Sequence, residues 1–398
     1  MKRQNKNIKT VSILITSAFL MQLFPGLTFA QVRSDTYERI IIAGENANKG
    51  IYDPSVEYNK DGSIGWLVYS ALESPEDSKK LLLPISKTVA THLAKSTDNG
   101  KTWQFITELN SSTEAAVPLN GKTISGVWWN EVPTLVHDPD DSGREWKLFW
   151  HKYFAIPRPY FGFPPAAQGD LIRVLQYMWI AYKYAKTPEG LASAKEIILF
   201  GAGKMPVAPY KAEHNLNEII NWPEAKLFSE PGSLFRDGVL YLSLSGFTGP
   251  DVKNDKLFLI ATFDHGKTWK HVGNLIDYND AADFGYIRFI GSSLVEENER
   301  VFLLVAPVNN KGIQLGTYVF EFEDISQAKL KRDEKGKLIA HKYLERSLPK
   351  ELNSGQSDYD MYNTYGGIIM PQADLSSAPA YGQIFNTNER IIDKPPGP

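Results

Sequence analysis

The chain has 398 residues, with 43 Lys or Arg, 46 Asp or Glu, and no Cys. The absence of Cys excludes disulfides and a lipid anchor on cysteine, so the fold must depend on an apolar core. The first 30 residues contain four basic residues and no acidic one, which leaves 39 basic against 46 acidic residues, a net charge of −7. This balance argues against nucleic acid or an anionic membrane as the main partner.

The N-terminus has the pattern of a secretory signal peptide. Basic residues are followed by an apolar run over 11–23 and then by the small-x-small motif Thr28-Phe29-Ala30. We predict cleavage after Ala30, a secreted or periplasmic protein with no stable membrane anchor, and one domain over 31–398. The alternative is a membrane anchor, for which the apolar run is short.

One octet occurs twice in the chain, as STDNGKTW over 96–103 and as TFDHGKTW over 262–269. In each copy we expect Asp98 or Asp264 to bond backbone N–H groups of the turn, the following Gly to supply a positive φ, and the Trp to be buried. The octet resembles the Asp-box, a hairpin motif of sialidases and some other β-propellers. This resemblance implies an architecture and names no reaction.

Five segments repeat a common plan of an apolar strand, a polar turn and an aromatic strand, beginning near residues 52, 130, 230, 290 and 365. Further strands after the first four pairs bring each unit to four strands. We therefore predict an all-β protein, a β-propeller with five four-stranded antiparallel blades. Six blades are the alternative and would need a unit within 190–228. Irregular, Pro-rich insertions are expected near 151–170 and 204–228, as loops that bind substrate or cover the rim.

Three of the units open with a carboxylate, namely Asp53, Glu131 and Glu230. Because the innermost strands of a propeller start near one face of its channel, these side chains should converge there. Hydrolysis of a glycosidic bond needs one protonated and one ionised carboxyl group, and a third carboxylate nearby raises the pKa of the acid. We therefore predict these three residues as catalytic.

Residues 52–56 (YDPSV) and 230–242 (EPGSLFRDGVLYL) carry a second resemblance. They are similar to the first and third blades of five-bladed glycoside hydrolases of the arabinosidase and xylosidase type. That resemblance implies Asp53 as general base and Glu230 as general acid, with Glu131 at the position of a pKa-tuning Asp. The chain departs from the family pattern by having Glu-Pro instead of Glu-x-Pro, and Glu instead of Asp on the second blade.

Two other functions remain open. A sialidase-like enzyme would hold the carboxylate of its substrate with three arginines and use a Tyr nucleophile. Arg158, Arg173, Arg236 and Arg288 are available, with Arg288 the best anion-binding candidate, and Tyr362 and Tyr365 are candidate tyrosines. The usual Arg-Ile-Pro motif is absent. The other alternative is a propeller that binds glycan or protein without catalysis.

Aromatic residues near the second unit are candidates for stacking on sugar rings, chiefly Trp128, Trp129 and Tyr153. We expect Trp103 and Trp269 to lie in the core. The sequence has no nucleotide-binding loop, no Gly-x-Ser-x-Gly and no His-Glu-x-x-His. Its seven histidines show no metal-ligand spacing, so we predict no cofactor and no zinc site, while a structural calcium ion stays possible. The predicted partner is an oligo- or polysaccharide or a glycoconjugate.

Overall fold

The computed structural model describes residues 31–32, 37–47, 50–73, 88–157, 171–202, 211–249, 251–345, 355–374 and 381–393. The predicted signal peptide lies outside these ranges. The described chain consists almost entirely of strands, with two short α-helices, α1 (Leu216–Ile219) and α2 (Tyr278–Asp283). Neither of them has the length and apolar character that crossing a bilayer requires.

The strands form four hydrogen-bonded sheets, of which the first two come from the N-terminal half. The first contains β4 (Gly50–Tyr58), β5 (Gly65–Glu73), β6 (Thr88–Ser96) and β7 (Trp103–Asn110), with β3 (Ile42–Ala43) beside β7. The second contains β8 (Thr113–Leu119), β9 (Lys122–His137), β10 (Trp146–Pro157), β11 (Leu171–Ala185), β12 (Ile197–Gly201) and β13 (His214–Asn215).

The third sheet contains β14 (Leu227–Arg236), β15 (Val239–Phe247), β16 (Lys256–Thr262) and β17 (Lys270–Ile276). The fourth contains β18 (Arg288–Glu297), β19 (Arg300–Val308), β20 (Thr317–Asp324), β21 (Lys329–Leu330), β22 (Ala340–Leu344) and β1 (Gln31–Val32). A further group, β2 (Glu38–Arg39), β23 (Ile369–Asp374) and β24 (Tyr381–Asn386), joins the first sheet through one parallel bridge from Gly382 to Gly50.

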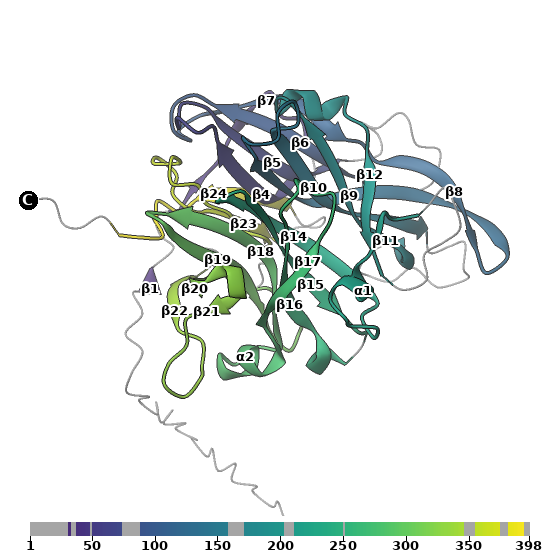
Figure 1. Ribbon diagram of the computed structural model, residues 1–398. Coiled ribbons are helices and arrows are strands. Elements are labelled where there is room, and N and C mark those ends of the chain that lie inside the picture. The colour runs from purple at the N-terminus through teal and green to yellow at the C-terminus, as the bar shows by residue number, and fades with distance from the viewer. Residues whose placement is uncertain are drawn as a thin grey trace, which may run out of the picture.

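The sheets are arranged as a β-propeller, which confirms the predicted fold class. The first long strand of each sheet contacts that of the next, from β4 to β9, β14 and β18. The C-terminal strand β24 pairs with the N-terminal β2 on one side and with β4 on the other. Figure 1 shows β24 beside β4. The number of five blades stays a prediction, because backbone pairing divides the described strands into four sheets.

A β-bulge interrupts each of these four inner strands at the same place. The pairing register shifts by one residue at Asp53, Val132, Glu230 and Gly291. All four have a positive φ, between 47° and 62°. In three of the strands the next residue is Pro, which suits a position where the ladder is already broken. A bulge of this kind breaks the regular alternation of side chains along the strand. In β14 it turns the Glu230 side chain toward β18 of the neighbouring sheet.

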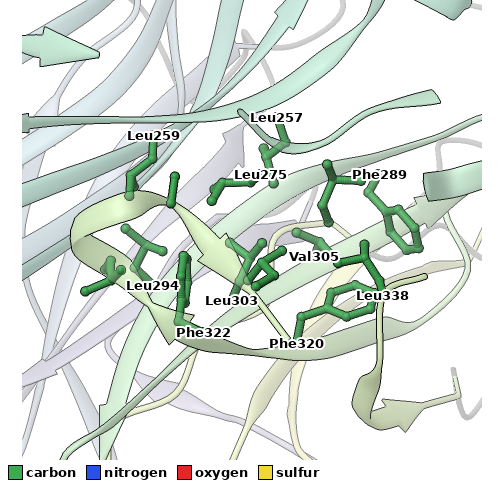
Figure 2. Close-up of a cluster of buried hydrophobic side chains, with 14 of the residues drawn as sticks. Leu257, Leu259, Leu275, Phe289, Leu294, Leu303, Val305, Phe320, Phe322 and Leu338 are labelled. Atoms are coloured by element: carbon green, nitrogen blue, oxygen red, sulfur yellow. The ribbon is translucent and has the colours of Figure 1, made fainter. Parts of the chain in front are cut away.

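Apolar side chains fill the space between neighbouring sheets. In the largest cluster, leucines of the third sheet face aromatic and aliphatic residues of the fourth, as Figure 2 shows for Leu257, Leu275, Phe289, Leu303 and Phe320. Each such side chain stabilises the fold by about 1.5–3 kcal/mol when fully buried. This packing fixes the angle between sheets, and with it the positions of the inner strands.

The two octet turns have the predicted local geometry. Asp98 accepts hydrogen bonds from the backbone N–H of Thr102 (2.9 Å) and from its hydroxyl (2.6 Å). Asp264 makes the equivalent bonds with Thr268, at 2.9 and 2.7 Å. The following glycines have φ of 87° and 95°. Both tryptophans are buried, with Trp103 2% and Trp269 7% exposed.

The two predicted insertions differ in outcome. Residues 151–157 are not a loop, because they continue β10 and pair with both β9 and β11. The rest of the first insertion, 158–170, lies outside the described residues, as does 203–210 of the second. In the second, the short helix α1 begins after the N-cap Asn215, and Trp222 is buried in a core cluster.

Candidate active site

A pocket of about 360 Å³ lies beside the bulges of β9, β14 and β18. Glu131 and Glu230 line it together with four basic residues, His151, Arg173, Lys226 and Arg288. Two of the three predicted catalytic carboxylates and the predicted anion-binding arginine therefore share one pocket, although up to 157 residues separate them along the chain.

Glu230 is the first residue of the β14 bulge. Its Oε2 accepts hydrogen bonds from the Ser245 hydroxyl on β15 (3.0 Å) and from the backbone N–H of Gly291 in the β18 bulge (2.9 Å). Burial raises the pKa of Glu230, and the negative charge of Glu131 raises it further, whereas these two hydrogen bonds and Arg288 lower it. The net effect is a raised pKa, which favours a carboxyl group that keeps a proton.

Asp53 is the first residue of the β4 bulge and has the same kind of partners. The Ser70 hydroxyl on β5 donates to its Oδ2 (3.1 Å), and the backbone N–H of Gln356 donates to its Oδ1 (3.2 Å). Burial raises the pKa of Asp53 to about 7, with Glu131 and, less strongly, Glu230 adding to the rise and the two hydrogen bonds opposing it. This carboxyl group therefore titrates near neutral pH.

Short hydrogen-bonded links connect Asp53 to the pocket, although it does not line the pocket itself. Ser70, which donates to Asp53, accepts from the backbone N–H of Val132 (2.8 Å), the residue after Glu131. Gln356, whose backbone donates to Asp53, reaches with its side-chain amide to the carbonyl of Pro231 (3.2 Å), the residue after Glu230. These links place the three carboxylates near one another, beside the bulges of β4, β9 and β14.

Glu131 does not occupy the same position in its unit as Asp53 and Glu230, which corrects the sequence alignment of the three. The bulge residue of β9 is Val132, and Glu131 precedes it. Glu131 faces Arg173, whose guanidinium lies 3.3 Å from its carboxylate. The pKa of Arg173 is raised, first by the charge of Glu131, so the guanidinium stays positively charged. A one-residue shift along a regular strand would turn a side chain to the other face. Because the β9 bulge comes directly after Glu131, Glu131 still lines the same pocket as Glu230.

His151 and Tyr153 support Glu131 from β10. Burial lowers the pKa of His151 to about 3, helped by Arg173, so its imidazole is neutral although Nδ1 lies 3.9 Å from Glu131. Tyr153 is fully buried, with the guanidinium of Arg173 4.5 Å from the centre of its ring. It was predicted to stack on sugar, but its ring packs beneath Arg173 and is closed to solvent.

The two tryptophans proposed for stacking also lie in the core. Trp128 stacks on Trp179 with ring centres 5.0 Å apart and is 5% exposed. Trp129 packs against Tyr153 and is also 5% exposed. Neither ring lines the pocket. The aromatic side chain that does line it is Phe247, at the end of β15.

The arginines and Tyr365 are divided between the two ends of the propeller. Arg288 lines the pocket and forms an ion pair with Asp255 at 2.8 Å. Arg236 lies away from it, near Asp237 and Glu296, and Arg158 is outside the described residues. Tyr365 donates to Glu38, and its backbone N–H bonds to Asn99 of the first octet turn. It is therefore at the opposite end from Asp53.

Ser70, Ser245, Gln356 and Lys226 were not identified as functional from the sequence. A usable signal existed for the two serines, because each is a polar residue in the largely apolar second strand of its unit. Gln356 and its neighbour Gly355 had none. A Cβ on Gly355 would lie 2.3 Å from Oδ1 of Asp53, so this residue must lack a side chain for the carboxylate to fit.

Comparison with known proteins gives distant structural likeness. No protein-family model matches the chain, and no curated protein matches it. Among solved structures, a thermostable family-43 glycoside hydrolase is 11% identical, with 88% of this chain and 91% of that chain covered and a TM-score of 0.46. The catalytic domain of a GH62 α-L-arabinofuranosidase from Coprinopsis cinerea is 10% identical, with 89% and 98% covered and a TM-score of 0.43. A variant of the NanB sialidase from Streptococcus pneumoniae is 12% identical, with 88% and 70% covered and a TM-score of 0.44. The function proposed below therefore rests on the side chains around the pocket.

Proposed function

We propose that this protein is an exported glycoside hydrolase that cleaves a glycosidic bond between two carboxyl groups, Asp53 and Glu230. The observation that carries the proposal is the pair of matched bulges. Each bulge holds one carboxyl group whose pKa is raised by burial, and both groups lie beside the same pocket. Two such groups beside one pocket supply a proton donor and a proton acceptor together.

The roles follow from the surroundings and the family resemblance. Glu230 lines the pocket and acts as the general acid that protonates the leaving oxygen. Asp53, with a pKa of about 7, is the general base, since a base that titrates near the working pH accepts protons most effectively there. Glu131 is the third carboxylate, and its charge raises the pKa of both.

The basic residues at the pocket indicate how substrate is held. Arg173 and Arg288 each keep one carboxylate partner within the protein, so their remaining N–H groups are available to sugar hydroxyls. Lys226 adds a third positive charge at the exposed rim, and Phe247 offers an aromatic edge. An oligo- or polysaccharide with hydroxyl-rich faces suits this lining.

A sialidase-like activity is the second candidate, favoured by the three positive charges at the pocket. It differs from the first in needing three guanidinium groups around one carboxylate. Among the described residues, two arginines and one lysine line this pocket. Acidic sugars therefore belong in the substrate panel beside neutral ones.

The test uses the mature chain and a panel of aryl glycosides whose phenols are weakly acidic and so need protonation to leave, including pentosides, hexosides, sialosides and uronides. We expect hydrolysis of at least one neutral glycoside, and a loss of about a hundredfold or more in kcat for Glu230→Gln. Glu323→Gln, which removes an exposed carboxylate on β20, is the matched control and should keep full activity. Equal rates for Glu230→Gln and the unaltered protein would exclude the hydrolytic site and leave a glycan-binding module.

Export is tested separately from activity. We expect the protein recovered from the medium or periplasm of a bacterial host to begin at Gln31, as determined by N-terminal sequencing. Recovery of the uncleaved chain in the membrane fraction would support the anchor instead.

A further inference from the structure

A histidine in the first sheet lies among carboxylates that take no part in the proposed reaction. His92 is on β6 and is 1% exposed. Its ring is held between Tyr69 and Phe105, with ring centres 5.9 and 5.2 Å away. Glu73 at the end of β5 and Glu108 on β7 approach the same ring from two sides. The ring therefore has one fixed orientation.

Glu45 fixes which nitrogen of His92 carries the proton. Its Oε2 lies 2.9 Å from Nδ1 and also accepts from the Tyr69 hydroxyl. Its Oε1 accepts the backbone N–H groups of Asn46 and Ala47 at 2.7 and 2.8 Å. With all these bonds, Glu45 is a rigid acceptor for Nδ1–H. This is the arrangement in which a carboxylate orients a metal-binding histidine through its other nitrogen.

The opposite nitrogen, Nε2, is buried and makes no hydrogen bond. It points between Oε1 of Glu73 at 3.5 Å and Oε2 of Glu108 at 3.8 Å. These three atoms all lie within 4.8 Å of one another. Two atoms bound to one zinc ion in tetrahedral geometry are roughly 3.4 Å apart, so small side-chain movements would give all three a common ligand distance.

We propose that His92, Glu73 and Glu108 form a binding site for a divalent transition-metal cation of the zinc type, with Glu45 as the positioning residue behind His92. One imidazole and two carboxylates are ligands that zinc accepts, and a fourth position is left for water. Glu108 is 36% exposed, which gives the ion a path from solvent.

A second cluster of ligand-type side chains in the same chain already has a cation supplied by the protein. Asp138, Asp141 and His265 also bring their ligand atoms within 4.8 Å of one another. There the ammonium group of Lys147 lies 2.8 Å from both aspartates and is fully buried. A protein cation already balances that cluster.

The proton is the competitor for Nε2. Burial by itself lowers the pKa of His92, but the nearby carboxylates of Glu108, Glu45 and Glu73 raise it to about 9. The same negative field that holds a proton attracts a divalent cation more strongly, since binding exchanges one positive charge for two.

The experiment titrates Zn²⁺, and Mn²⁺ for comparison, into the chelator-treated mature chain without a histidine tag, using calorimetry and elemental analysis. We expect one Zn²⁺ per chain and an increased unfolding temperature, because the ion joins β5, β6 and β7. Co²⁺ at the same site should give visible absorption bands of a four-coordinate ion. Glu108→Gln, at a partly exposed position, and His92→Gln should each weaken Zn²⁺ binding at least tenfold.

His265→Gln is the matched control and should bind Zn²⁺ as the unaltered chain does. Glu45→Gln should also weaken binding about tenfold or more while leaving all three ligands in place. The proposal is overturned if the unaltered chain binds no Zn²⁺, or if Glu108→Gln and His92→Gln bind it as tightly as His265→Gln. It is also overturned if NMR finds His92 as an imidazolium that persists at saturating Zn²⁺.

Discussion

In both the β4–β7 sheet and the β14–β17 sheet, an acidic residue opens a bulge on the inner strand, and a serine on the next strand donates to it. Both sheets also contain an octet turn. The acids nevertheless meet different charges, since Asp53 has Glu131 and Glu230 nearby, whereas Glu230 has Arg288 as well as Glu131. The repeated local structure thus places two carboxyl groups at equivalent bulges, and the neighbouring sheets surround them with different charges.

The largest expected effect separates the acid from the base. Asp53→Asn should lower kcat about a hundred- to ten thousandfold on every substrate, because the base is needed whatever the leaving group. Glu230→Gln should do the same on aryl glycosides with poor leaving groups but lose much less on those with strongly acidic phenols, which need no protonation. Rates on a series of aryl leaving groups measure this. The opposite pattern would exchange the two roles.

Stability should depend on pH through the raised carboxyl groups. Asp53 and Asp358 have pKa values raised to about 7, and Asp360 to about 6, in each case first by burial. Because the unfolded groups titrate near 3.9, their contribution is present below about pH 4 and is lost as pH rises through 6–7. We expect the unfolding temperature to fall by roughly 5 °C from about pH 5 to about pH 8.

A thermal scan across this range checks the direction, and Asp53→Asn supplies the control. The variant has no carboxyl group to ionise at that position, so its unfolding temperature should fall less steeply. Stability that rises from pH 5 to pH 8 would contradict the raised pKa values.

The two octet turns should contribute equally. Asp98→Ala and Asp264→Ala each remove bonds to the N–H and hydroxyl of one threonine, so each should lower the free energy of unfolding by about 1–2 kcal/mol. Urea denaturation measures the loss. Asp140→Ala, at an exposed position in the turn between β9 and β10, is the control and should change little. A large loss of kcat in either octet variant would show that the turn is more than structural.

The smallest effect concerns the serines. Ser70→Ala removes a hydrogen bond that lowers the pKa of Asp53, and Ser245→Ala removes one that lowers the pKa of Glu230. The acidic limb of the pH–rate profile should move up in Ser70→Ala and the alkaline limb in Ser245→Ala, each by less than about one pH unit. If both variants moved the same limb, the two serines would not serve separate carboxyl groups.

Much of the fold was predictable because its signals are local. The octet gave its turn and its buried Trp from eight residues, and the unit plan gave the all-β propeller. The predicted loop over 151–170 was wrong over 151–157, which pair as strand. Aromatic and Pro-rich composition suggested a loop there, but pairing with β9 and β11 on both sides decides the conformation.

The site was predictable in part. Asp53 and Glu230 stand at equivalent bulges, and Arg288 lines the pocket, as expected from their places in the units. Trp128 and Trp129 are of a residue type that stacks on sugar rings. They are nevertheless buried, because β9 continues through the core. Histidine spacing could not indicate the His92 cluster, since its members come from three strands and the loop before β4.

The sequence by itself determined which residues turn, which strands pair within a unit, and where an acid stands next to a proline. These features depend on a few neighbouring residues and on the alternation of side chains along a strand. The tertiary structure alone decided which acids share a pocket, how much water each loses, and which cation or hydroxyl faces it. Those quantities depend on contacts between segments that are far apart in the chain, such as Gln356 with Asp53, 303 residues away, where packing brings the groups together.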